Sequence, residues 1–141
     1  MSTQVTHKLN WNGPALRGQV VEASVGGVQE FGLTHETKAK SKLRKGRGVL
    51  TGTLRRSIHA GALDYNYAED EYPPSNQTPE QGGQMPDVAE RDGVVGVAVG
   101  SGQPYARKIE ALYAYMAESH AEALTELPGI LEKHVAKAGL A

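Results

Sequence analysis

Apolar side chains recur at steps of three and four residues in two separate parts of the chain. In the first part, Leu16, Val20 and Phe31 belong to such a stripe, which predicts an amphipathic helix over residues 14–41. Asn12, a favourable N-cap, precedes a proline that suits the first helical turn. Each glycine inside this helix weakens it by about 1 kcal/mol relative to alanine. We therefore expect either one long helix held by a packing partner or two shorter helices.

A second helical stripe follows Pro104 and includes Ile109 and Leu112. Its spacing predicts a helix that ends at Pro128, because a proline followed by a glycine breaks or restarts a helix. A short last helix that ends at Gly139 is then expected.

Between the helices, two apolar stretches predict strands near residues 58–65 and 93–102, which should pair antiparallel. Thr51 is expected to cap one helical turn over residues 52–57 that leads into the first strand. The alternative is that the first strand already begins at Leu54. The long segment between the two strands then becomes a hairpin loop.

The predicted order of helix, strand, strand and helix is typical of the α+β class. At 141 residues the chain is expected to form a single domain, residues 1–141. We expect a long N-terminal helix, a small antiparallel β-sheet with a long hairpin loop, and C-terminal helices.

Charge separates the middle of the chain into a basic arm, residues 38–48, and an acidic loop, residues 64–92. The whole chain has a formal net charge of -1, which argues against a general polyanion binder. In the acidic loop the candidate contact residues are Glu69, Asp70 and Glu71. The basic candidates are Lys38, Lys40, Lys42, Arg44, Lys45 and Arg47, followed by Arg55 and Arg56.

Three interpretations of the basic arm stay open. Opposite blocks on one chain suit head-to-tail association, in which the basic arm of one subunit meets the acidic loop of its neighbour. A solvated linker is the second interpretation. Contact with nucleic acid is the third, because lysine and arginine release counterions from phosphates. The absence of aromatic residues between Leu33 and Tyr65 disfavours base stacking.

Residues that often carry catalysis or bind metals form no familiar constellation, so we expect no enzyme activity, cofactor or metal. With Cys 0, disulfides, zinc–thiolate sites and thiol catalysis are excluded. The stretch GRGVLTGT lacks the lysine and the spacing of a nucleotide-binding phosphate loop. Ser57 and Ser101 lack a nucleophile elbow. The histidines, none with the spacing of a metal site, are His7, His35, His59, His120 and His134.

The hydropathy pattern contains no membrane signal. No window approaches the roughly 20 apolar residues of a membrane span, and the first residues lack an apolar signal segment. We expect a soluble protein that is made in a cytoplasm and has no membrane partner.

Two stretches resemble the signatures of the gene-product-ten-like tail-component family of lambdoid and other long-tailed bacteriophages. LTGTLRRSI, residues 50–58, resembles the first signature, and VGVAVGSGQPYARKIE, residues 95–110, resembles the second. The resemblance spans roughly residues 14–110, including the long helix that precedes the first signature. The matching positions are Thr51, Gly52, Leu54, Arg55, Ser57 and Ile58 in the first signature and Tyr105, Ala106, Ile109 and Glu110 in the second.

The resemblance implies a virion structural protein of the head–tail junction, assembled in the host cytoplasm. It implies a neck, connector or tail-completion protein that forms a ring, a hexamer or dodecamer, and joins the portal side of the capsid to the tail tube. Its partners would be neighbouring connector or adaptor proteins and the tail tube or tail terminator, with non-specific contact to DNA in the channel. The alternatives are a tail terminator that caps the tail tube and a small DNA-binding accessory protein.

Overall fold

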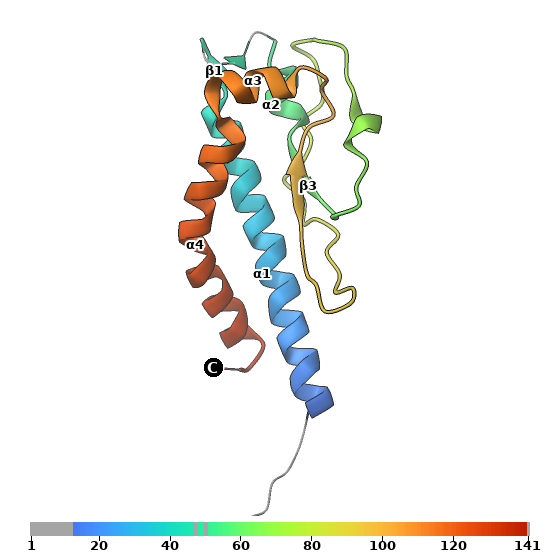
Figure 1. Cartoon of the computed structure of the whole chain (residues 1–141), viewed down its shortest axis with the longest axis vertical. Helices are drawn as coiled ribbons and strands as arrows, with labels where there is room; N and C mark the ends of the chain where they lie inside the picture. Colours follow the sequence, from blue (N-terminus) through green and yellow to red (C-terminus); the bar gives the residue numbers. More distant parts are fainter. Residues whose placement is uncertain (1–12, 47, 50, 141) are drawn as a thin grey trace, which may run out of the picture.

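The computed structural model describes residues 13–46, 48–49 and 51–140, with the backbone alone at positions 45, 48 and 49. The chain forms a mixed helix and sheet fold, as predicted (Figure 1). The elements in chain order are α1 (Gly13–Lys42), β1 (Arg44–Lys45), β2 (Gly48–Val49), α2 (Thr53–Ser57), β3 (His59–Gly61), the 3-10 helix η1 (Tyr67–Asp70), β4 (Ala98–Gly100), α3 (Ala106–Tyr113) and α4 (Tyr115–Lys137).

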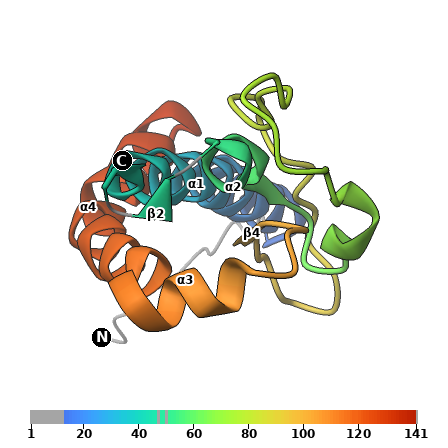
Figure 2. The ribbon, with the colours of Figure 1, turned by 90° about the horizontal axis from the view of Figure 1, so that it is seen from above.

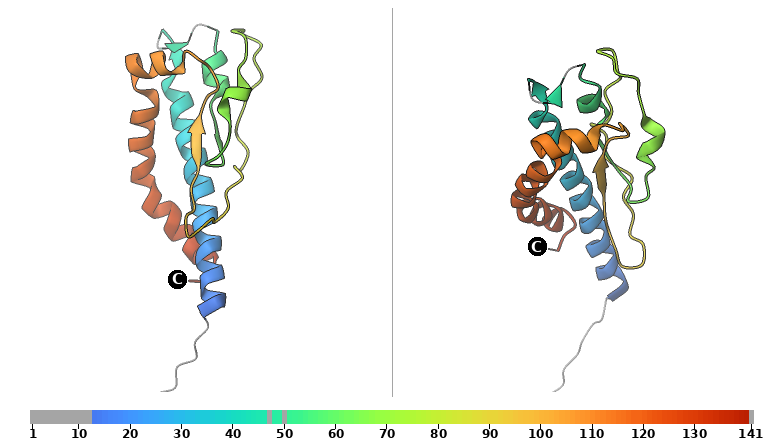
Figure 3. Two further views of the ribbon diagram at one scale, coloured as in Figure 1. Left: turned by 45° about the vertical axis from the view of Figure 1, so that its right-hand side comes forward. Right: turned by 45° about the horizontal axis from the view of Figure 1, so that its top comes forward.

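The long helix α1 lies between α4 on one side and the β3–β4 sheet on the other (Figures 1 and 3). It is one continuous helix, which confirms the predicted bounds to within a residue and excludes the alternative of two helices. Gly26 and Gly27 face α4. A Cβ atom added at Gly27 would lie 2.7 Å from Leu131 Cδ2, and one added at Gly26 would lie 2.6 Å from His134 Nδ1. The missing side chains therefore permit the close contact between the two helices.

The C-terminal helices differ from the prediction. The break lies at Ala114, with a φ of 49° in the left-handed region, and α4 continues through Pro128 without a separate last helix. Glu110 explains the position of the break, because its Oε2 accepts a hydrogen bond from the Met116 N–H at 2.7 Å and its Oε1 one from the Ala117 N–H at 3.1 Å. These bonds satisfy N–H groups that lack partners in the first turn of α4.

The sheet confirms the predicted antiparallel pairing but is shorter than predicted. In β3 and β4, His59 pairs with Gly100 and Gly61 pairs with Ala98. Strand β3 ends early because the chain turns at once, with the Tyr65 N–H bonded to the Ala62 carbonyl at 3.0 Å. The helical turn α2 precedes β3, so the alternative of a strand from Leu54 is wrong. The additional strands β1 and β2 form a parallel pair of two residues each.

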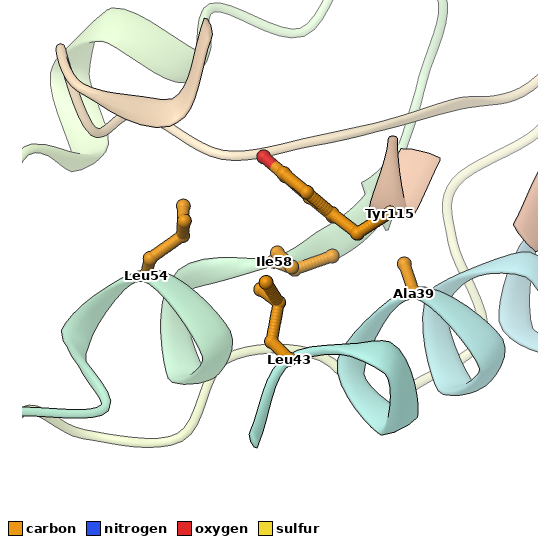
Figure 4. Packing of buried hydrophobic residues seen from close by; sticks show 5 residues of the cluster. All are labelled: Ala39, Leu43, Leu54, Ile58 and Tyr115. Carbon is orange, nitrogen blue, oxygen red and sulfur yellow. The ribbon is translucent and has the colours of Figure 1, made fainter. Parts of the chain in front are cut away.

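The apolar core is small and lies at the end of the helix pair where α2 and α3 cross it. Ala39 and Leu43 of α1, Leu54 of α2, Ile58 before β3 and Tyr115 at the start of α4 point toward one another (Figure 4). Each of these side chains is at most 2 % exposed. The core therefore joins segments that are far apart in the sequence.

Candidate interaction groove

An open groove of about 510 Å³ lies beside this core. The helices that contribute to its lining, α2 and α3, are at the upper end of the molecule in Figure 1. Seen from above, α2, α3 and the β1–β2 segment surround that end (Figure 2). The lining is mainly apolar and includes Leu54, Pro74, Tyr105, Ile109, Leu112 and Tyr113.

The first family-like stretch forms one wall of the groove. Gly52 takes a φ of 83°, a conformation that favours glycine, and ends the turn before α2. Thr51 Oγ1 lies 3.0 Å from Thr53 Oγ1 and thus supports the same turn. Leu54 and Ile58 enter the core. The buried hydroxyl of Ser57 donates to the Leu54 carbonyl at 2.7 Å.

The second family-like stretch forms the opposite wall. Tyr105, Ala106 and Ile109 pack against the core residues that the first stretch supplies. Burial raises the pKa of the Tyr105 hydroxyl, which keeps this side chain neutral. Glu110 caps α4, so the matching positions of the second stretch shape the groove and orient the helix behind it. The two stretches thus meet in space although about 40 residues separate them in sequence.

The lysines of the predicted basic arm do not form a free arm. Lys38, Lys40 and Lys42 lie in α1 and pair with carboxylates of their own chain, so these three positions are not part of a solvated linker. Each nitrogen reaches an acidic oxygen: Lys38 Nζ lies 3.1 Å from Glu126 Oε2, Lys40 Nζ 2.7 Å from Glu80 Oε1, and Lys42 Nζ 2.6 Å from Glu122 Oε1.

The two arginines of α2 face different surroundings. Arg55 is exposed. Arg56 turns inward, and its Nη2 donates to the carbonyls of Thr51 and Ser75, each at 2.9 Å. The Arg56 guanidinium therefore fastens the acidic loop to the turn before α2, and a contact of Arg56 with a partner stays a prediction.

Of the remaining basic candidates, the structure describes the side chain of Arg44. Arg44 in β1 is exposed, whereas Arg47 and the side chain of Lys45 lie outside the described residues. Two exposed cations that the sequence analysis missed, Arg107 and Lys108, belong to α3 beside the groove. The signal that could have found them is their position inside the second family-like stretch, beside the matching residues Ala106 and Ile109.

The acidic candidates also divide into bound and free side chains. Asp70 is held inside its own chain, because its carboxylate accepts a hydrogen bond from the Tyr65 hydroxyl and lies 3.6 Å from His59 Nε2. This hydrogen bond is the main cause that raises the pKa of Tyr65 to about 12. Glu69 and Glu71 are exposed and contact no cation among the described residues.

The acidic loop is fastened to the body by a buried carboxylate. Glu36 of α1 is 3 % exposed, and it accepts hydrogen bonds from the backbone N–H groups of Ala60 and Gly83, each at 2.9 Å. Thr53 adds a second attachment, since its hydroxyl lies 2.9 Å from that of Thr78. The loop is therefore an ordered covering of α1 and β3 and not a free extension.

The described residues contain no cluster of three or more histidine, aspartate or glutamate side chains that could hold a metal ion. Among the described helices, none is long and apolar enough to cross a membrane. No protein-family model, curated protein or solved structure matches the chain.

Proposed function

We propose that this chain is a structural subunit of the head–tail junction of a long-tailed bacteriophage. In this proposal it is a neck, connector or tail-completion protein that forms a ring between the portal side of the capsid and the tail tube. The protein acts by docking and carries out no catalysis. Its partners are further copies of itself and the neighbouring proteins of the neck or tail.

The observation that carries the proposal is the meeting of the two family-like stretches around one groove. Thr51, Gly52 and Leu54 lie on one wall, and Tyr105 and Ile109 lie on the other. If the positions of the two stretches served packing alone, we would expect all of them to be buried in the core. These five residues also border an open apolar surface. Exposed apolar surface of this kind is typical of sites that contact another protein.

The charge distribution supports docking to protein more than to DNA. The lysines of α1 are engaged with glutamates of their own chain, so three of the cations proposed for the basic arm are not free to contact phosphates. With a net charge of -1, the chain also lacks the overall positive charge that non-specific DNA binding requires. The accessory DNA-binding alternative is therefore less well supported.

Deletion of the gene in the phage or prophage that encodes this chain tests the proposal. We expect DNA-filled heads and separate tails of normal length in electron micrographs, with infectious particles restored by a plasmid-borne copy. Tails of irregular length would favour the tail terminator. Normal yields of intact virions would refute a role at the junction.

A complementation series sharpens the same experiment. A plasmid copy with Leu112→Glu places a charge in the groove, and we expect it to fail in restoring joined particles. A copy with Leu124→Glu on α4 is the matched control, since both leucines are largely exposed, 64 % and 44 % respectively. Equal rescue by both copies would show that the groove is not the docking surface.

A further inference from the structure

Exposed cations stand next to residues that line the groove. Arg44, Arg55 and Lys108 are exposed, and each lies within two residues of a lining residue, Gly46, Leu54 and Ile109 respectively. We call these three side chains the basic rim. Among the described residues none of these side chains contacts a carboxylate. The lysines of α1, in contrast, are paired. An apolar groove with an unpaired basic rim suits an acidic segment that also presents apolar side chains.

A surface with this composition exists on the same molecule. Residues 63–71 run from the end of the β3 turn through η1 and carry the unpaired carboxylates of Glu69 and Glu71. Leu63 is 62 % exposed and Tyr65 is 40 % exposed, so the segment also presents apolar surface. We call residues 63–71 the acidic edge.

Pro74, which lines the groove, follows the acidic edge by three residues, yet neither Glu69 nor Glu71 contacts a cation among the described residues of its own copy. Seen from above, η1 lies at the right margin of the structure and α4 at the left, with α3 along the lower side (Figure 2). A contact between these carboxylates and the cations beside the groove would therefore join two copies head to tail. Such a heterologous contact repeats from copy to copy and closes into a ring when the rotation allows it.

We propose that the acidic edge of one copy docks in the basic-rimmed groove of the next copy. Glu69 and Glu71 face the rim cations, and the apolar side chains of the edge cover the exposed part of the groove around Leu112. This contact rests on the proposed function for its biological setting, since it specifies how copies would meet in a ring. In this contact the rim residues, and not Lys38, Lys40 and Lys42, are the basic partners of the acidic edge.

Cysteine crosslinking tests the contact directly, because the natural chain has Cys 0 and any disulfide must come from introduced residues. One purified full-length variant carries Ala68→Cys in the acidic edge, and the other carries Leu112→Cys in the groove. Mixed and oxidised, they are expected to form a heterodimer well above the level of either homodimer. Leu124→Cys on α4 replaces the groove variant in the control and is expected to give no such product.

A second experiment reverses charges on the two surfaces. Combined Arg55→Glu and Lys108→Glu changes in the groove variant, or Glu69→Lys and Glu71→Lys in the edge variant, should each reduce the crosslink about tenfold or more. Both reversed variants together should restore it, because every contact is again between opposite charges. Circular dichroism confirms that the exposed substitutions leave the fold intact.

Three results would overturn the proposal. The first is the absence of a crosslink between Ala68→Cys and Leu112→Cys, and the second is a crosslink whose yield neither charge reversal changes. The third is salt-dependent binding of duplex DNA that Arg55→Glu with Lys108→Glu abolishes, while no crosslink forms. The last result would assign the rim to nucleic acid. Gene deletion tests the role in the virion separately. If this contact were refuted, heads and tails could still fail to join in the absence of the gene, and the proposed function would stand.

Discussion

The two ends of the α1–α4 helix pair are held by different kinds of contact. At the groove end, Leu43 and Ile58 are fully buried at 0 % exposure, and Tyr115 closes the core above them. At the other end, α1 meets α4 through glycines and through Glu30, which contacts Lys133 and His134. Leu16 and Val20 beyond that contact remain 46 % and 47 % exposed.

This difference places most of the apolar stabilisation beside the groove. Burial of large side chains is the dominant favourable contribution to folding, whereas partly exposed ion pairs contribute little. The groove end is therefore expected to be the rigid end, and the opposite end to open at lower free energy. A rigid wall favours docking, because a mobile wall would lose conformational entropy on binding and affinity would fall.

The largest effect is expected from Ile58→Ala at the groove end. Removing the buried side chain loses apolar burial and leaves a cavity, so the free energy of unfolding should fall by about 2–5 kcal/mol. Leu124→Ala, on the exposed face of α4, should change it by less than about 0.5 kcal/mol. Urea denaturation followed by circular dichroism measures both. Similar losses for the two variants would contradict the unequal distribution of the core.

A second large effect is expected where the acidic loop is fastened to the groove end. In Glu36→Gln, an amide N–H₂ replaces one acceptor oxygen beside the N–H groups of Ala60 and Gly83, so one buried donor loses its partner. The free energy of unfolding should fall by about 1–3 kcal/mol. Glu22→Gln, exposed on the same helix, is the control and should be nearly neutral. Limited proteolysis should also cut the loop faster in Glu36→Gln alone.

The fold could be predicted in its main elements, and the reasons are visible in particular residues. Helix α1 followed from the spacing of Leu16, Val20 and Phe31, and the antiparallel pair followed from two short apolar stretches. The break at Ala114 was missed because its cause is the Glu110 carboxylate, a capping contact that helical periodicity does not encode. The continuation through Pro128 was missed because packing on α1 overrides the local preference.

The candidate site was predicted only in part. The two family-like stretches can be marked in the sequence, but sequence order cannot show that they form opposite walls of one groove. Counting charges also failed to separate bound from free cations. Lys42 and Arg44 each count as one positive charge in the sequence. Of the two, Lys42 pairs with a glutamate of α4, and this pair forms because the fold brings α1 and α4 together.

The comparison can be tested at the opposite end through its glycines. In Gly26→Ala, the new methyl group would lie 2.6 Å from His134 Nδ1, so the ring must leave its contact with Glu30. We expect a loss of about 1 kcal/mol, since overpacking outweighs the gain in helix propensity. Gly18→Ala is the matched control, because nothing lies within 4 Å of the added atom, and it should gain about 0.5–1 kcal/mol. Thermal melts that shift in the same direction would refute the close helix contact.

The smallest effect is expected from the ion pairs that hold this end. The hydrogen bond from Lys133 is the main cause that lowers the pKa of Glu30 below the ordinary value of 4.5. A carboxylate with a lowered pKa stabilises the fold at pH values above its unfolded pKa, and this contribution is lost as the pH falls through the folded pKa. Glu30→Gln should therefore lose about 0.5–1 kcal/mol at pH 7, and its difference from the natural chain should shrink as the pH falls below the ordinary pKa of 4.5. Urea melts at a series of pH values from 7 downward measure the difference, with Glu132→Gln, exposed on α4, as the control. A difference that does not change with pH would show that Glu30 acts through packing, and the opposite end would then depend on shape more than on charge.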